Sequence, residues 1–241
     1  MRGEFEVKIA LKIFKVLFHT LCIIIVFGTI ALAVWRIFML ETPSELKRIV
    51  PNEQVCEAYK ENGNSLTLYY QDQSTLTRTE ENSGYFGAIN VTFIKEADQL
   101  QVVFRYNIST LKHLKEDYSL AEIPDRNGDY FDVTVSISSD LTPENEEDNF
   151  GNDPASVAQK RYYPTSYTTY QNSLYNYVKY VFDDICVDES TLAVYLDVYY
   201  NEDKDYSEEA YGTLCLYDYA LKNVERKLTD ADKKLIEEFS K

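Results

Sequence analysis

The chemistry open to this chain is limited first by how little histidine it contains. Only two of the 241 residues are histidine, His19 and His113. Because His19 falls in an apolar run, a nucleophilic site of the serine–histidine–aspartate or cysteine–histidine kind would depend on His113 alone, and no zinc site with several histidines can be assembled. Sequence motifs of metalloproteases, α/β-hydrolases, phosphate loops and dinucleotide-binding folds are also absent. We therefore predict no catalytic residue and expect a protein that is not an enzyme.

Carboxylates are plentiful, with 40 Asp and Glu residues, so a hydrolase that uses a carboxylate pair stays open as an alternative. Some alternate along loops as calcium ligands do: Asp125, Asn127 and Asp129 in one loop, and Asp203 and Asp205 in another. Neither loop has the glycine and the final glutamate that an EF-hand requires. Because acidic loops serve solvation more often than metal binding, we expect no cofactor and keep Ca²⁺ as the alternative.

Four cysteines are present, and Cys22 lies in the apolar run near the N-terminus. If the rest of the chain faces an oxidising compartment, the other three allow one disulfide. Cys186 and Cys215 are the best pair, because both fall in or beside expected strands of the same half of the domain. Buried thiols are the alternative, and the cysteine spacing fits no zinc-binding motif.

Tyrosine is in excess, and fourteen of the 21 lie between Tyr162 and Tyr219. In the expected strand Thr191–Tyr200, Tyr195 and Tyr199 fall opposite the aliphatic side chains, so they should face solvent or be covered by a neighbour. An aromatic ring with a hydroxyl group suits a sugar, a peptide or a protein surface. We therefore name Tyr195 and Tyr199 as candidate ligand-binding residues. The alternative is that tyrosine is simply common in half-exposed strands.

The elements that must position these side chains begin with an apolar run, Val16–Val34, that contains no charged residue. At about 1.5 Å per residue, a helix over residues 16–40 crosses the roughly 30 Å hydrocarbon layer of a bilayer. Ala31-Leu32-Ala33 would suit signal-peptide cleavage, but the run is longer than a signal core and ends in the interface-type pair Trp35-Arg36. We predict an uncleaved transmembrane helix over 16–40, with a cleaved signal or a buried soluble helix as the alternatives.

Basic residues are slightly more frequent before this span than after it. Residues 1–15 hold Arg2, Lys8, Lys12 and Lys15, whereas Arg36, Lys47 and Arg48 follow the apolar run. This bias predicts a short cytoplasmic tail over 1–15 and an extracytoplasmic C-terminal domain, in a single-pass protein of the cell membrane whose partner over residues 16–40 is the lipid bilayer.

The charge of the chain limits its partners. The formal net charge is −16, and residues 1–36 contribute +3 (five basic minus two acidic residues), so the remainder carries −19. A domain this acidic repels phosphate backbones, which argues against nucleic acid as a partner.

From Ser65 the hydrophobic period becomes two, which indicates strands with one buried face. Eight strands are expected: Ser65–Gln71, Tyr85–Lys95, Leu100–Ile108, Tyr130–Ser138, Tyr162–Tyr170, Leu174–Phe182, Thr191–Tyr200 and Gly212–Tyr219. Such alternation needs antiparallel sheets that each bury one face. The predicted fold of residues 65–220 is therefore mainly β, an antiparallel β-sandwich of immunoglobulin-like architecture.

Helical patterns flank the expected strands. Residues 41–64 predict a helical juxtamembrane linker, with Pro51 at the first helical position. Ser109 predicts the cap of a short helix between the third and fourth strands. Thr229 and Asp232 have the spacing of a capping box, which predicts an amphipathic C-terminal helix within 221–241.

Together these features predict a membrane-tethered, extracytoplasmic β-sandwich that binds a protein or a glycan and is not catalytic. Two alternatives remain: a carboxylate-based extracytoplasmic hydrolase, and an accessory subunit of a membrane complex that is held by its helix.

Overall fold

The computed structural model describes residues 2–40, 42–72, 86–139, 159–187, 191–200, 210–218 and 224–240. The chain divides into two compact units, Met1–Thr42 and Pro43–Lys241. Each unit is described here by itself.

The first unit is a single helix, α1 (Arg2–Leu40). Its segment Phe14–Phe38 is long and apolar enough to cross a membrane, and none of that segment is buried in the structure. Large apolar side chains such as Phe27 and Phe38 are about two-thirds exposed, at 68% and 67%. The prediction of one N-terminal apolar helix is confirmed. The length and composition of this helix fit a membrane anchor and a signal sequence alike.

Polar side chains within α1 are satisfied by the helix itself. The Thr20 hydroxyl donates to the Val16 carbonyl at 3.0 Å, and the Thr29 hydroxyl donates to the Val26 carbonyl at 2.8 Å. His19 Nδ1 lies 2.7 Å from the Lys15 carbonyl. Backbone carbonyls one turn earlier therefore serve these polar groups, which lowers the cost of placing them in apolar surroundings.

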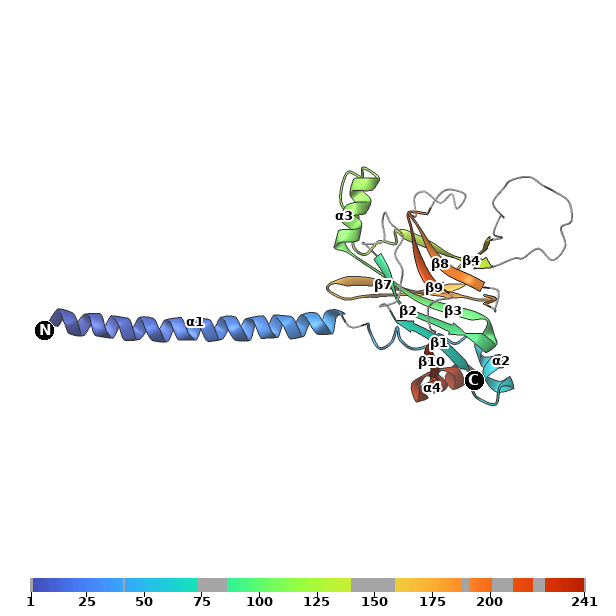
Figure 1. Ribbon diagram of the computed structural model, residues 1–241, viewed down its shortest axis with the longest axis horizontal. Helices are drawn as coiled ribbons and strands as arrows, with labels where there is room; N and C mark the ends of the chain where they lie inside the picture. The colour runs from blue at the N-terminus through green and yellow to red at the C-terminus, as the bar shows by residue number, and fades with distance from the viewer. Residues whose placement is uncertain are drawn as a thin grey trace. The chain divides into compact units, whose positions relative to one another are not determined.

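The second unit is mainly β and contains two antiparallel sheets (Figure 1). The six-stranded sheet has the order β10-β1-β2-β3-β7-β6, and the four-stranded sheet has the order β5-β4-β8-β9. The strands of the first sheet are β1 (Thr67–Asp72), β2 (Phe86–Ile94), β3 (Gln99–Asn107), β6 (Ser166–Gln171), β7 (Tyr175–Phe182) and β10 (Val224–Lys227). Those of the second are β4 (Phe131–Ser139), β5 (Gln159–Tyr162), β8 (Thr191–Tyr200) and β9 (Gly212–Asp218). The predicted antiparallel, β-rich fold is confirmed, whereas the immunoglobulin-like architecture is not.

Two strands differ from the sequence prediction. The expected strand Tyr162–Tyr170 is divided between the sheets, because the connection that contains Pro164 ends β5 in one sheet and β6 begins in the other at Ser166. Proline has no N–H for a sheet ladder, so a break at this position follows from its chemistry. Strand β10 was not predicted, because its four residues are too few and too polar to show a period of two.

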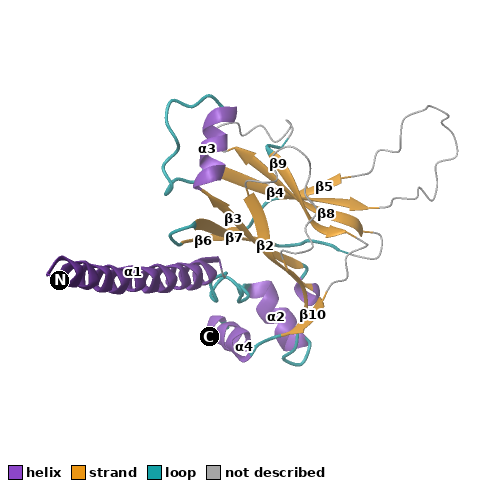
Figure 2. Ribbon diagram, turned by 60° about the vertical axis from the view of Figure 1, so that its left-hand side comes forward, coloured by secondary structure: helices purple, strands orange, loops and turns teal. Residues whose placement is uncertain are grey.

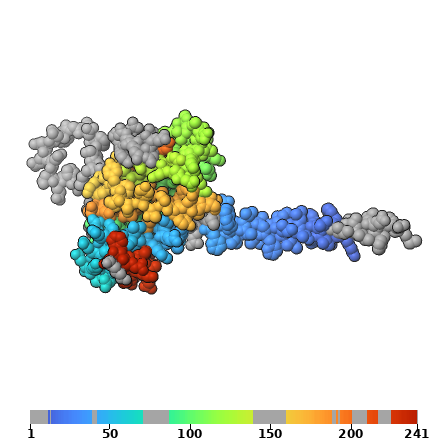
Figure 3. Space-filling model, turned by 180° about the vertical axis from the view of Figure 1, so that it is seen from behind, coloured from blue at the N-terminus to red at the C-terminus, as the bar shows by residue number. Residues whose placement is uncertain are grey.

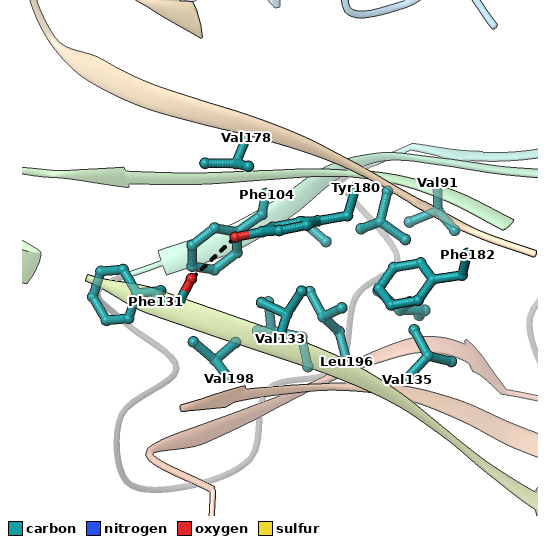
Figure 4. Packing of buried hydrophobic residues seen from close by; sticks show 14 of the residues in the cluster. Val91, Phe104, Phe131, Val133, Val135, Val178, Tyr180, Phe182, Leu196 and Val198 are labelled. Carbon is teal, nitrogen blue, oxygen red and sulfur yellow. Dashed lines mark hydrogen bonds between the residues drawn. The ribbon is translucent and has the colours of Figure 1, made fainter. Parts of the chain in front are cut away.

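One buried cluster contains side chains from both sheets, which pack on each other through it (Figure 4). Phe104, Val178 and Phe182 come from the six-stranded sheet, while Val133 and Leu196 come from the four-stranded sheet. The hydroxyl of Tyr180 in β7 donates to the carbonyl of Phe131 in β4 at 3.1 Å (dashed in Figure 4). Burial of the phenol raises the pKa of Tyr180 well above its ordinary value, so the hydroxyl stays protonated and keeps this hydrogen bond between the sheets.

Helices α2 (Glu53–Glu61) and α4 (Asp230–Phe239) lie side by side and, with β1, enclose a second buried cluster (Figure 2). Asn52 caps α2 by accepting from the Val55 N–H at 2.9 Å. Pro51 therefore precedes the cap, and the prediction that it is the first helical residue was wrong. The predicted capping box of Thr229 and Asp232 at the start of α4 is confirmed. It satisfies backbone groups that the first helical turn leaves without partners.

The remaining helices are α3 (Ile108–Asp117) and the short 3₁₀ helix η2 (Lys95–Ala97). Asn107 caps α3, and its side chain accepts from the N–H groups of Ser109 and Thr110. The predicted cap at Ser109 was therefore wrong by two residues. Both residue types cap helices well, but only Asn107 has the extended backbone that a capping residue needs.

The stretch of residues 43–50, here called the strap, lies in the second unit and packs on the six-stranded sheet. Leu46 is buried with Val103 and Tyr177. Lys179 Nζ in β7 donates to the carbonyls of Leu46, at 3.2 Å, and of Arg48.

Two further side chains hold the end of the strap. Gln101 in β3 accepts from the Val50 N–H and donates to the Val50 carbonyl, both at 2.9 Å. The Ile49 N–H donates to Asp232 of α4 at 3.1 Å. The residues that the sequence assigned to a linker, 41–64, are thus part of the domain from residue 43 onward.

Candidate functional site

The site begins with the hairpin of β6 and β7, which forms one edge of the six-stranded sheet. Asn172 closes its turn, because the Asn172 carboxamide oxygen accepts from the N–H groups of Leu174, at 2.9 Å, and Tyr175, at 2.8 Å. Asparagine commonly forms such turns with the backbone two or three residues ahead. The local sequence therefore fixes a tight hairpin and places β6 at the open edge.

Strand β6 exposes every one of its six side chains. Tyr167 and Tyr170 are 58% and 38% exposed, and Tyr163, just before the strand, is 53% exposed. The ring centroid of Tyr167 lies 6.1 Å from that of Tyr180, and the ring of Tyr170 lies 6.0 Å from that of Tyr177, both in β7. Because side chains alternate along a strand, Tyr167 lies on the same face as Tyr180, and Tyr170 lies on the opposite face with Tyr177. The hairpin, gold in Figure 3, therefore exposes tyrosine on both of its faces.

A turn at residues 125–128 lies against the tip of this hairpin. The Gly128 N–H donates to the Asp125 carbonyl, and the Asp125 carboxylate accepts from the Asn127 N–H, both at 3.1 Å. The Arg126 guanidinium donates to the carbonyls of Asn172 and Ser173, while the Asn176 amide donates to the Arg126 carbonyl at 2.9 Å. Two-way hydrogen bonding of this kind fixes the loop over the start of β7.

Two cavities open between the hairpin, this turn and the beginning of β4. The larger, of about 210 Å³, is lined by Tyr106 of β3, the turn 126–129, residues 169–171 of β6 and residues 176–178 of β7. The smaller, of about 150 Å³, is lined by Asp129, residues 131–133, Tyr163, Pro164, Tyr167 and Tyr180. Asp129 lines both, so the two are neighbours, and we call them together the β6 cavities.

The walls of the larger cavity combine aromatic rings with groups that form hydrogen bonds. The Tyr106 hydroxyl donates to the Gly128 carbonyl at 3.2 Å. Burial raises the pKa of Tyr106, and a hydrogen bond with Asn176 offsets part of that rise, so the phenol is a neutral donor at physiological pH. Among the described residues, the buried carboxamide oxygen of Asn176 has no hydrogen-bond partner. The arrangement is suited to holding a polar ring, because it offers flat apolar faces beside hydroxyl and amide groups.

The structure places the predicted tyrosines of β8 elsewhere. Tyr199 is buried, at 4% exposure, and the guanidinium of Arg161 lies over its ring at 5.9 Å, so it is covered by a neighbour. Tyr195 is half-buried. On the same strand, Asp197 accepts from the Ser136 and Thr213 hydroxyls at 2.7 and 2.9 Å. Neither tyrosine lines the β6 cavities.

The calcium candidates divide between described and undescribed residues. Asp203 and Asp205 lie outside the described residues. In the other loop, Asp125 and Asn127 form the turn, and Asp129 lines the cavities. Within the described ranges, no group of three or more His, Cys, Asp or Glu side chains is arranged to hold a metal ion. A sequence with aspartate at the first position of a turn and glycine at the fourth is typical of a β-turn, which accounts for Asp125 and Gly128 in this loop.

The two cysteines proposed to pair are not joined in the structure. Cys186 is exposed and Cys215 is buried in β9. A disulfide requires the two Cβ atoms to lie about 3.5 to 4.5 Å apart and to face each other, and membership of the same half of the domain does not ensure this. Cys56, also buried, directs its thiol to the Ile236 carbonyl at 3.7 Å, where it packs between α2 and α4.

Sequence reasoning found the excess of tyrosine and a strand over Tyr162–Tyr170, but it did not single out the tyrosines that this strand exposes. The missed residues are Tyr163, Tyr167, Tyr170 and Asn176. A signal for them exists, because the run Ser166–Gln171 contains no aliphatic residue, and a strand without an apolar face belongs at a sheet edge. Asn176 gives no such signal, since its missing partner is visible only in three dimensions.

Comparison of the chain with protein-family models, with curated proteins and with solved structures gives no match.

Proposed function

We propose that this chain is a membrane-tethered binding protein that is not catalytic, and that its partner, a protein or a glycan, binds at the β6 cavities. The observation that carries the proposal is a set of exposed tyrosines that line two neighbouring cavities: Tyr163 and Tyr167 line the smaller one, and Tyr170 lines the larger one. Tyrosine is enriched at binding surfaces because it supplies a large rigid contact area at a low cost in conformational entropy.

In this proposal the domain is a β-sandwich, and helix α1 is an uncleaved anchor with the domain on the extracytoplasmic side. The shared core of the two sheets supports the first part, and the exposed apolar length of α1 supports the second. The excess of basic residues before the apolar run supports the orientation. A tag at the C-terminus should then be accessible to protease on intact cells, and protection until the membrane is permeabilised would reverse the orientation.

Binding at the β6 cavities can be tested by site-specific photocrosslinking in living cells. A benzophenone amino acid in place of Tyr167 should give a covalent adduct of higher mass, because this side chain lines the smaller cavity and is exposed. The matched control is the same replacement at Phe239, which is 54% exposed on α4, away from the cavities. An adduct at both positions, or at neither, would contradict the proposal.

A second candidate, the carboxylate-based hydrolase, is favoured by one observation. Asp129 and Asp132 both line the smaller cavity, and hydrolysis of a glycosidic bond uses two carboxyl groups on opposite sides of that bond. If this candidate is correct, Asp129→Asn and Asp132→Asn should each abolish turnover of a bound glycan while binding persists. If the glycan is released unchanged by the native chain, the hydrolase is excluded for that glycan.

A further inference from the structure

The outer edge of β6 differs from the other edges of the two described sheets. One sheet ends in β10 and β6, and the other ends in β5 and β9. Strands β10 and β5 carry charged residues, in the sequences VERK and QKRY, and β9 pairs with β8 through a register shift. Charges and irregular pairing protect an edge strand from joining another strand. Strand β6, with the sequence SYTTYQ, has no charge and pairs with β7 in one continuous register, so its edge lacks this protection.

The surroundings of β6 in the sequence are uncharged as well. No charged residue lies between Arg161 and Lys179, in a chain of which 27% is charged. The chain beyond residue 36 carries a net charge of −19, from −16 for the whole chain and +3 for residues 1–36, so two copies of the domain repel each other overall. At β6 two copies can meet without placing like charges opposite each other, which would destabilise a pair of strands.

The backbone of β6 offers hydrogen-bonding groups to a further strand. The Asn172 N–H donates to the Tyr175 carbonyl at 3.0 Å, which fixes the ladder between β6 and β7. In an antiparallel ladder, residues that bond to the neighbouring strand alternate with residues whose N–H and C=O groups point the other way. Counting back from Asn172, the residues of β6 whose backbone groups point away from β7 are Tyr167, Thr169 and Gln171.

The order of side chains in β6 suits pairing with a second copy of the same strand. A two-fold axis perpendicular to the sheet makes two β6 strands antiparallel and requires that residues opposite each other lie on the same face. With this axis at Thr169, Thr169 lies opposite itself and Tyr167 lies opposite Gln171 of the second copy, so the outward backbone groups of both strands gain partners. On the other face, Tyr170 lies opposite Thr168 of the second copy, and an aromatic residue beside a β-branched one stabilises paired strands.

The same axis places equivalent parts of both copies on the same side. Leu46 of the strap packs with Tyr177, whereas the next residue of β7, Val178, faces the core shared by the two sheets. The strap and the four-stranded sheet therefore lie on opposite faces of the six-stranded sheet. Because the axis preserves faces, both straps lie on one side of the joined sheet. Two chains anchored in one membrane need this arrangement, since each domain is entered through its strap.

We infer that two copies of this chain associate through β6, antiparallel and centred on Thr169, and so join their six-stranded sheets into one. The inference goes beyond the proposed function. It places the β6 cavities of both copies on the face away from the straps, because these cavities are lined by Val178 and Tyr180 of the shared core. A partner with repeated groups would then bind both copies at once and gain avidity.

Cysteine crosslinking of the full chain in membranes tests the register. The background carries Cys22→Ser and Cys186→Ser, which remove the two exposed cysteines among those described. Thr169→Cys should give a covalent dimer on oxidation, because directly opposite residues of a hydrogen-bonded pair have Cα atoms about 5.5 Å apart, within reach of a disulfide.

The matched control is Thr168→Cys, on the same strand and also exposed. In the inferred register its equivalent in the second copy lies diagonally across, at a Cα separation of about 7 to 8 Å, beyond ordinary disulfide reach. Thr168→Cys should therefore give less than about a tenth of the dimer formed by Thr169→Cys. Dimer at Thr168 alone, equal dimer at both positions, or dimer at neither overturns the inference.

Charge variants at Thr169 test the association without a covalent bond. Thr169→Lys and Thr169→Glu each place like charges opposite each other, so the dissociation constant of the dimer, measured by sedimentation of the full chain in detergent, should rise about fivefold or more. An equal mixture of the two variants should restore association to within about twofold of the native chain, because lysine then faces glutamate. The backbone groups of Thr169 point away from β7, so both variants should keep the native melting temperature. A dimer that persists in both variants, or a mixture that does not associate, overturns the inference.

The photocrosslink at Tyr167 separates failure of this inference from failure of the proposed function. If the chain is a monomer and the adduct contains another molecule, the inference is wrong and the proposed function stands. If the chain pairs through Thr169 and the adduct contains a second copy alone, the inference stands and the proposed binding site is wrong.

Discussion

At the scale of single residues, the domain places a lysine where charge is costly. Lys179 is 5% exposed, and burial lowers the pKa of its ammonium group to about 8, with Asp232 raising it and Arg226 lowering it to smaller extents. Its partners are backbone carbonyls of the strap and not a carboxylate. Lys179 therefore secures the strap at the expense of burying a cation whose charge the surroundings only partly compensate.

This lysine should give the domain a characteristic dependence on pH. In the unfolded chain Lys179 keeps its ordinary pKa of 10.5, so between about pH 8 and 10 the unfolded state binds more protons than the folded state. The free energy of unfolding should therefore rise, by about 1 to 2 kcal/mol, as the pH increases from 8 to 9.5. Denaturant titrations at each pH measure this rise. Lys179→Met should abolish it and the exposed-residue control Lys227→Met should retain it, and a rise that persists in Lys179→Met would contradict the assignment.

A buried carboxylate joins three segments and should be important for stability. Asp232 is fully buried, and it accepts from the Ile49 N–H, from Thr229 and from Arg226 at 3.3 Å. Asp232→Asn removes the charge that these donors face, so we expect the free energy of unfolding to fall by about 2 to 4 kcal/mol. Chemical denaturation measures the loss. The control Asp230→Asn, in the exposed first turn of α4, should cost less than about 1 kcal/mol.

At the scale of secondary structure, the edge strand β6 depends on the turn that joins it to β7. Asn172→Ala would leave the N–H groups of Leu174 and Tyr175 without the acceptor that now fixes the turn. We expect a loss of about 1 to 2 kcal/mol and faster hydrogen exchange in β6, while exchange in the interior strand β3 stays slow. Hydrogen exchange detected by mass spectrometry resolves the two strands. The control Thr168→Ala, an exposed side chain of β6, should leave the exchange pattern unchanged.

Strands with a clear hydrophobic period of two could be predicted from the sequence. The burial of a strand's second face could not, because it depends on contacts with other parts of the fold. The alternation in Phe131–Ser139 and Thr191–Tyr200 identified β4 and β8, because one face of each is buried. Periodicity does not show whether the second face is also covered, which is why Tyr199 was named as a binding residue although it is buried. The exposed tyrosines of β6 lie in a strand without an apolar face, so the hydrophobic pattern gave no reason to prefer them.

At the scale of the whole chain, the role of helix α1 is separate from that of the domain that follows it. Its apolar segment Phe14–Phe38 satisfies the length of both an anchor and a signal sequence. If the helix is an uncleaved anchor, tags placed before Arg2 and after Lys241 should be detected on one polypeptide that stays in the membrane pellet after alkaline carbonate extraction. Loss of the N-terminal tag from an extractable product would identify a cleaved signal instead.

The strap also decides where tension enters the domain. Leu46 and Arg48 are held by Lys179 in β7, and Val50 is held by Gln101 in β3. In the order β10-β1-β2-β3-β7-β6, both of these strands have a neighbour on each side. A load applied to the chain before residue 43 therefore reaches interior strands ahead of either edge. An interior strand is held by hydrogen-bond ladders on both sides, whereas an edge strand has one, so this attachment places the load on the more strongly held part of the sheet.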